Sequence, residues 1–183
     1  MNNYTPLTSP NFESGDVVKT EDIAHERLKS DRSAARYMAL QVLYEVDSTG
    51  HQVGVVLNEQ LLLREFNLDL LEMEHIDLEI TEMLEQIVTG VIKHLELIDQ
   101  VIQKYATEWP LNQVATIDRN ILRIAVYEFA IGRRVNPAIA IDEAVRLAKW
   151  FGADGSPRFV NGVLGAITSD LDTVKKMLGN IES

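Results

Sequence analysis

The apolar residues of this chain recur at helical spacing along most of its length. Ala35, Ala39, Val42, Leu43 and Val46 are three or four residues apart, so they form one face of an α-helix. The same period predicts seven helices, at about 31–49, 53–66, 76–94, 98–105, 117–131, 139–151 and 156–171. No segment alternates with a period of two, so the pattern predicts no strand and an all-α fold.

The helix expected at 117–131 differs from the others because it is apolar on most sides. A helix of this kind usually lies at the centre of a bundle, so we expect it to be the spine of the fold. Residues 1–30 show little periodicity and are predicted to be a mobile N-terminal tail. A single compact helical domain is expected over residues 31–178.

The composition excludes several classes of protein. The chain has 183 residues, of which 46% are hydrophobic and 25% charged, as in ordinary soluble proteins. It has no cysteine, which excludes disulfides, thiolate metal sites and cysteine nucleophiles and fits a reducing cytoplasm. No apolar run approaches the roughly 18 residues that span a bilayer, and the first residues lack the features of a secretory signal. We expect a cytoplasmic protein without membrane association.

The formal net charge of −11 opposes binding to nucleic acid on average, but the charge is unevenly distributed. Residues 59–108 hold twelve acidic and three basic residues. Residues 119–158 hold seven basic and four acidic residues, and residues 25–36 hold four basic and two acidic ones. Two mildly basic stretches therefore stand apart from an acidic middle, although charge alone favours solvated helix surface as the explanation.

Signals for catalysis are weak throughout the sequence. It has no phosphate-binding loop, no dinucleotide-binding fingerprint and no nucleophile elbow. The four histidines are scattered, so a histidine metal site is not expected. Acidic residues crowd together at Asp69, Glu72, Glu74 and Asp77, but a solvated turn explains them better than a catalytic pair does. We expect a protein that is not an enzyme and needs no cofactor or metal.

The stretch Ser156–Phe159 combines features that suit single-stranded RNA. Ser156 is a good candidate for the N-cap of a helix, and Pro157 suits the first helical position. Phe159 is expected at the rim of the apolar stripe, with Arg158 pointing away from it. The backbone N–H groups of a helix N-terminus bind anions, and an aromatic ring beside them offers a surface for a base. A purely structural role for Phe159 is the alternative.

Four blocks of sequence resemble a known family. They are ALQVLYE (39–45), IDRNILRIAVYEFA (117–130), AIDEAVRLAKWFG (140–152) and RFVNGVLGAI (158–167), and their order and spacing are similar to those of the NusB family of bacterial transcription antitermination proteins. The resemblance covers about residues 31–171. It implies seven helices in two small sub-bundles and a non-enzymatic role in RNA binding.

The resemblance also implies partners and site residues. NusB-type proteins pair with the ribosomal protein NusE, bind boxA RNA and help to load an antitermination complex onto RNA polymerase. Members of the family contact RNA through an arginine-rich stretch at the start of the first helix, where this chain has Arg32 and Arg36, and through a basic–aromatic pair that matches Arg158 and Phe159. Fewer arginines are present here, which implies weaker binding. A homodimer that covers the basic face is a further possibility within the family.

Two functions of different classes follow. The first is an RNA-binding antitermination factor in which Arg32, Arg36, Arg158 and Phe159 form one basic and aromatic patch, where the first and last helices begin. The second is a protein-interaction module of the same fold that has no significant RNA binding of its own. An enzyme that uses the acidic cluster at 69–77 ranks below both.

Overall fold

The computed structural model describes residues 31–62 and 78–179, and within these ranges it is helical and contains no strand. The all-α prediction is confirmed. The α-helices are α2 (Asp31–Thr49), α3 (Val53–Leu62), α5 (Leu78–Lys93), α6 (Leu95–Tyr105), α7 (Thr116–Val126), α8 (Pro137–Phe151), α9 (Ser156–Ser169) and α10 (Leu171–Leu178). A short 3-10 helix, η1 (Leu111–Gln113), precedes α7, and a π-helical turn, η2 (Tyr127–Ile131), follows it.

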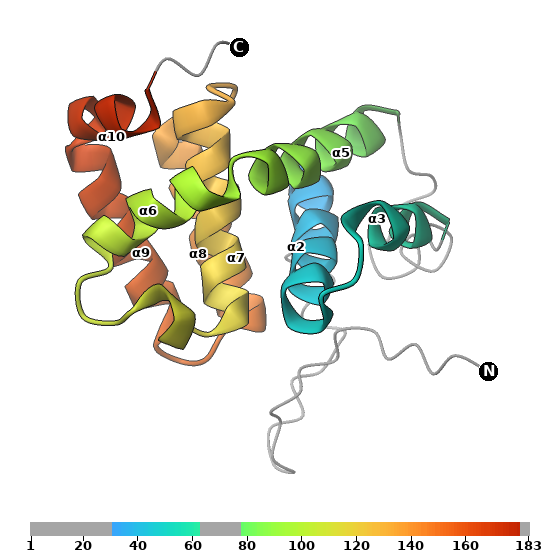
Figure 1. Cartoon of the computed structure of the whole chain (residues 1–183), viewed down its shortest axis with the longest axis horizontal. Helices are drawn as coiled ribbons and strands as arrows, with labels where there is room; N and C mark the ends of the chain where they lie inside the picture. The colour runs from blue at the N-terminus through green and yellow to red at the C-terminus, as the bar shows by residue number, and fades with distance from the viewer. Residues whose placement is uncertain (1–30, 63–77, 180–183) are drawn as a thin grey trace.

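The helices form two groups that share one core (Figure 1). The first group contains α2, α3 and α5, and α2 packs against both of the others. The second contains α6 to α10, in which α8 and α9 lie side by side and α10 packs across the end near α6. Helix α7 joins the groups because it packs against α2 and α5 on one side and against α6, α8 and α9 on the other. The predicted pair of sub-bundles is confirmed.

The helix that was predicted to be the spine is the most deeply buried element. Every residue of α7 from Asn120 to Val126 is buried, which confirms the expectation drawn from its apolar residues on all sides. The π-helical turn η2 then brings the Tyr127 ring against α5 at Gly90. A Cβ atom on Gly90 would collide with this ring, so glycine lets α5 and η2 approach closely.

An ionic network ties the end of α2 to the second group of helices. The Asp47 carboxylate accepts hydrogen bonds from Arg119 (Nη2, 2.8 Å) and Arg123 (Nη1, 2.8 Å) on α7. Arg123 also donates two bonds of 2.7 Å to Asp99 on α6. Its guanidinium is buried, and two carboxylates balance its charge, so the network holds three helices in one arrangement.

The structure divides the last predicted helix in two, and the helix predicted at 98–105 begins earlier, at Leu95. The last helix was expected to run to residue 171, but α9 ends at Ser169 and a separate helix, α10, begins at Leu171. Asp170 breaks the helix with φ −128° and ψ 40°, and its carboxylate accepts a hydrogen bond from the Tyr105 hydroxyl (2.8 Å). The helix expected at 53–66 is described only as far as Leu62, and the tail expected at 1–30 lies outside the described residues. None of the described helices is both long and apolar enough to cross a membrane.

Candidate nucleic-acid interface

The basic–aromatic pair lies on the first turn of α9. The stripe of Val160, Val163, Leu164 and Ile167 is buried and fixes which side of α9 faces the core. Arg158 is exposed and Phe159 is half-buried against that core, as the helical periodicity predicts. A cation and part of an aromatic ring are therefore presented together at the N-terminus of a helix. We call Arg158, Phe159 and the N-terminal turn of α9 the α9 edge.

The prediction that Ser156 is the N-cap of this helix is wrong. Gly155 occupies the N-cap position, and the backbone N–H of Phe159 donates to the Gly155 carbonyl (3.0 Å). The Ser156 hydroxyl instead donates to the Asp118 carboxylate on α7 (2.8 Å), and both side chains are buried. Among the described residues, no backbone acceptor engages the Arg158 N–H, so this donor remains at the α9 edge.

A buried acid lies directly beneath the start of α9. Burial raises the pKa of the Asp118 carboxyl, and the hydrogen bond from Ser156 opposes that rise only in part. The second carboxyl oxygen, Oδ1, is buried and has no hydrogen-bond partner among the described residues. The Asp118 carboxyl beneath the α9 edge therefore keeps its proton to a higher pH than an exposed aspartate does.

The turn before α9 has room only for glycine at one position. A Cβ atom on Gly152 would lie 2.7 Å from the Ala148 carbonyl oxygen and would also collide with the Ser156 side chain. Nothing lies within 4 Å of the corresponding Cβ position on Gly155. Gly152 therefore allows the end of α8 to approach Ser156, which sets where α9 begins.

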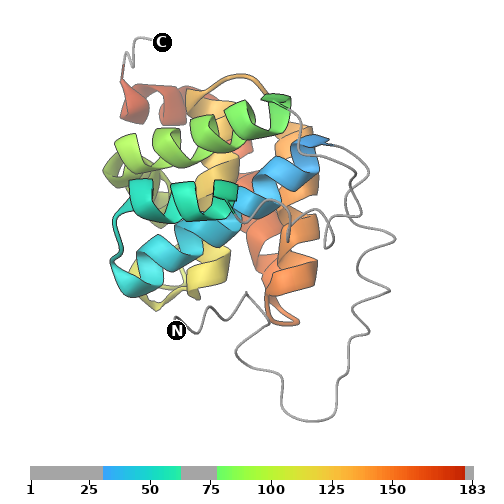
Figure 2. The ribbon, with the colours of Figure 1, turned by 90° about the vertical axis from the view of Figure 1, so that its right-hand side faces the viewer.

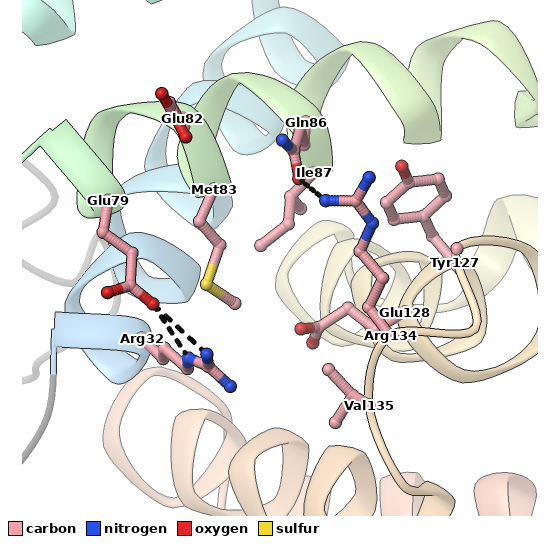
Figure 3. A pocket seen from close by; sticks show the side chains of 11 residues that line it. Arg32, Glu79, Glu82, Met83, Gln86, Ile87, Tyr127, Glu128, Arg134 and Val135 are labelled. Carbon is pink, nitrogen blue, oxygen red and sulfur yellow. Dashed lines mark hydrogen bonds and ion pairs between the residues drawn. The ribbon is translucent and has the colours of Figure 1, made fainter.

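Arg32 is exposed at the start of α2. Its guanidinium donates to the Glu79 carboxylate on α5 from Nε (3.3 Å) and Nη2 (3.2 Å), and both side chains are more than half exposed. An exposed pair of this kind contributes only about 0–1 kcal/mol, so phosphate can compete for Arg32. The pair lies at one side of an open cavity of about 280 Å³ between α2, α5 and η2, and Arg134 bonds Gln86 (2.6 Å) at its other side (Figure 3).

Arg36 does not lie on the surface, which corrects the expectation that both arginines of α2 face outward. Its Nε and Nη2 atoms each donate a 2.8 Å hydrogen bond to Glu128 on η2. Glu143 on α8 lies 3.6 Å away, and the Arg36 side chain is only 4% exposed. Burial raises the pKa of the Glu128 carboxyl, and Arg36 counteracts that rise. The geometry makes Arg36 a buried counter-ion that joins α2, η2 and α8.

The expected single patch where the first and last helices begin is also absent from the described structure. Arg32 shares its cavity with Val135, two residues before the start of α8, whereas Arg158 follows the end of α8. A helix of 15 residues is about 22 Å long, so the two arginines lie near opposite ends of α8. Figure 2 shows α2 beginning beside the upper part of α8, and the turn into α9 at the lower edge.

Reasoning from the sequence missed two groups that shape this region, Glu128 and Asp118. Both are acids in otherwise apolar helical segments, where a buried carboxylate signals a buried partner. The acidic residues considered for catalysis, between Asp69 and Asp77, lie outside the described residues. Within the described ranges, no three His, Asp or Glu side chains are grouped so that they could hold a metal ion.

Comparison with known proteins agrees with the fold and with the sequence blocks. The model of the NusB family matches residues 33–169. The transcription antitermination protein NusB of Chloroflexus aggregans is 40% identical over 145 residues, which cover 78% of this chain and 90% of that protein.

Two solved structures share the architecture. The structure of T. maritima NusB has a TM-score of 0.66 and 28% identity, over 78% of this chain and 94% of that chain. A structure of the antitermination factors NusB and NusE in complex with dsRNA has a TM-score of 0.65 and 27% identity, over 78% of this chain and 98% of that chain.

Proposed function

The chain belongs to the NusB family, and from this membership and the α9 edge we propose that it is a transcription antitermination factor that binds boxA-type single-stranded RNA together with NusE. In this role it is a binding protein rather than an enzyme, and it helps to assemble an antitermination complex on RNA polymerase. The name of the similar Chloroflexus protein supports the antitermination role. The similar structure of NusB and NusE in complex with dsRNA supports RNA binding and the NusE partner, whereas the preference for a single strand rests on the α9 edge.

The α9 edge is the observation that carries the proposal. Arg158 supplies a positive charge, the Arg158 N–H supplies an unengaged backbone donor, and Phe159 supplies part of an aromatic ring. A phosphate binds well at a helix N-terminus beside a guanidinium, and a base stacks on an aromatic ring in a sequence-tolerant way. Arg32, at the far end of α8, adds a second phosphate contact for a strand that follows α8.

The acidic helix α5 suits a protein partner better than it suits RNA. Glu79, Glu82 and Glu85 are exposed on it. Ribosomal proteins are usually basic, so complementary charge favours a partner such as NusE on an acidic surface over a nucleic acid. Because Glu79 pairs with Arg32, the partner's surface on α5 adjoins the second phosphate contact, whereas the α9 edge is built from other elements.

The burial of Arg36 favours the second candidate, a protein-interaction module without RNA binding of its own. Of the two arginines on α2 that match the family's basic stretch, only Arg32 is exposed, and the net charge of the chain is −11. Long-range repulsion between this charge and RNA weakens binding, above all at low salt.

A titration separates the two candidates. A fluorescently labelled boxA-like RNA oligomer is titrated with the protein at several salt concentrations, with and without NusE, and a duplex of the same sequence serves as a competitor. The proposal predicts saturable binding, and the logarithm of the binding constant should fall linearly with the logarithm of salt concentration. The duplex should compete less well than the unlabelled single strand does. An absence of binding even with NusE supports the interaction module instead.

A further inference from the structure

Three aromatic side chains gather where α8 ends and α2 crosses it. Trp150 and Phe151 are the last two residues of α8, and Tyr37 lies on α2. The Tyr37 and Phe151 rings are stacked, with centroids 5.3 Å apart and an interplanar angle of 25°. Trp150 meets Phe151 edge-on, with centroids 6.4 Å apart and an angle of 87°. We call these three residues the α8 aromatic cluster.

The position of the cluster connects it with the α9 edge. Phe151 is separated from Ser156, the first residue of α9, by a turn of only four residues. Helices α8 and α9 lie side by side, so the end of α8 and the start of α9 occupy the same end of this helical pair (Figure 1). Tyr37 belongs to the helix that also carries Arg32. The cluster therefore lies between the two elements that carry the proposed RNA contacts.

The cluster has the surroundings of a surface platform. All three rings are half-buried, whereas the largest side chains of the core are almost fully buried. Lys149, which precedes Trp150, is exposed. The Tyr37 hydroxyl accepts a hydrogen bond from Gln41 (2.9 Å), so a polar side chain borders the rings. Partly exposed rings beside a cation are the combination that single-stranded nucleic acids use for stacking and for phosphate contact.

From this arrangement we propose that the α8 aromatic cluster is a second base-stacking platform, which extends the RNA path from the α9 edge toward α2. The inference rests on the proposed function, since it takes the same RNA as ligand. One base stacks against the exposed part of the Trp150 ring, and Lys149 contacts the adjoining phosphate. Phe151 meets the Trp150 ring edge-on, and Tyr37 in turn stacks on Phe151. The platform lies at the same end of α8 as Arg158, and it extends the path from the α9 edge onto α2 through Tyr37.

The two tryptophans of the chain allow a direct test. They are Trp150 and Trp109, and Trp109 lies on the separate segment between α6 and η1. The Trp109→Phe variant leaves Trp150 as the only fluorophore of its kind, and the Trp150→Phe variant leaves Trp109. Each variant is titrated with unlabelled boxA-like RNA while tryptophan emission is followed, and binding is measured separately by the anisotropy of labelled RNA. We expect strong quenching in Trp109→Phe and little change in Trp150→Phe.

A third variant links the signal to affinity. Trp150→Leu removes the aromatic ring and keeps an apolar side chain, and its folding is checked by circular dichroism. We expect its RNA affinity to fall about 5- to 150-fold, the range that stacking of one base on one aromatic side chain supports. The Trp109→Phe variant is the matched control and is expected to bind RNA as the wild type does.

The outcomes separate this inference from the proposed function. If RNA binds the wild type but Trp150 emission stays constant, or if Trp150→Leu folds and binds with wild-type affinity, the platform is disproved and the proposed function stands. If RNA does not bind the wild type with or without NusE, both the platform and the proposed function are disproved. Should Trp150→Leu fail to fold, the quenching measured in Trp109→Phe decides alone.

Discussion

Arg32 and Arg36 lie one helical turn apart on α2, yet the side chain of Arg32 is 64% exposed and that of Arg36 is 4% exposed. Arg32 forms an open pair with Glu79, whereas Arg36 is held by two hydrogen bonds to buried Glu128. Two arginines four residues apart on one helix therefore have different roles. Arg32 remains available to a phosphate, and Arg36 fastens α2 to the second group of helices.

Replacing Arg36 should lower the stability of the fold, whereas replacing Arg32 should weaken RNA binding. Arg36→Ala leaves the Glu128 carboxylate buried without its partner, so we expect a loss of about 3–5 kcal/mol in the free energy of unfolding. Arg32→Ala should change stability by less than about 1 kcal/mol and should instead weaken RNA binding. Urea denaturation measures the first effect. Equal stability of the two variants would contradict the assignment of Arg36 as a buried counter-ion.

Gly152 and Gly155 form a matched pair in the turn before α9. Gly152→Ala places a Cβ atom against the Ala148 carbonyl and the Ser156 side chain, so it should displace the start of α9. Overpacking of this kind costs about 1–3 kcal/mol, and it should also weaken RNA binding at the α9 edge. Gly155→Ala meets open space and should leave both properties nearly unchanged. Thermal unfolding and RNA titration of the two variants check this prediction, which fails if they behave alike.

Asp118 should make stability depend on pH. Burial raises the pKa of the Asp118 carboxyl above the ordinary value of 3.8. Above pH 3.8 the carboxyl is therefore protonated more fully in the native state than in the unfolded chain. The unfolding free energy must therefore fall as pH rises through the interval between the two pKa values. Asp118→Asn lacks this ionisation. We expect the variant to gain stability relative to the wild type as pH rises above 3.8, as urea denaturation at a series of pH values would measure. A constant difference would show that Asp118 titrates normally.

Asp47 should make the protein less stable as pH falls, which is the opposite of the effect of Asp118. Burial opposes its ionisation, but hydrogen bonding and charge from Arg119 and Arg123 outweigh burial and hold its pKa below the ordinary value. Its contribution to stability is therefore present above pH 3.8 and is lost as pH falls through the lowered pKa. At neutral pH, Asp47→Ala should cost about 1.5–3 kcal/mol, as for the loss of a hydrogen bond to a charged group.

Asp142→Ala is the control for this network. The Asp142 side chain is 72% exposed and pairs only with Arg146 of its own helix in the described structure. A pair of this kind, four residues apart on a helix, contributes about 0.3–0.5 kcal/mol. If the two variants lose the same stability in urea denaturation, the proposed role of Asp47 in joining α2, α6 and α7 is incorrect.

The sequence predicts most of the fold because helical periodicity is a local property. The apolar stripes located the helices, and the apolar residues on all sides of α7 placed it at the centre. Periodicity did not reveal the break at Asp170, because the tertiary hydrogen bond from Tyr105 lies outside any local pattern. Nor did it reveal that Ser156 turns inward, since its partner Asp118 is 38 residues away in the chain.

The site was predicted in part. The half-buried ring of Phe159 and the exposed position of Arg158 followed from their angles relative to the stripe on α9. The burial of Arg36 depends on the Glu128 carboxylate, 92 residues away in the chain. The one local indication is that Arg36 lies beside the buried residues Ala35 and Ala39 on α2. The distance between the starts of α2 and α9 depends on how whole helices pack, which spacing within one helix does not reveal.

The salt dependence of RNA binding by an Arg158→Gln variant tests the central claim, that the α9 edge binds RNA, most directly. Lys175→Gln is the matched control, since it removes one positive charge from an exposed position on α10, beyond the opposite end of α9. In a plot of log affinity against log salt concentration for boxA-like RNA, Arg158→Gln should weaken binding and make the slope shallower by about 0.7, the value for one phosphate contact on a single strand. Lys175→Gln should keep the wild-type slope. If both variants keep that slope and bind as the wild type does, RNA does not contact the α9 edge.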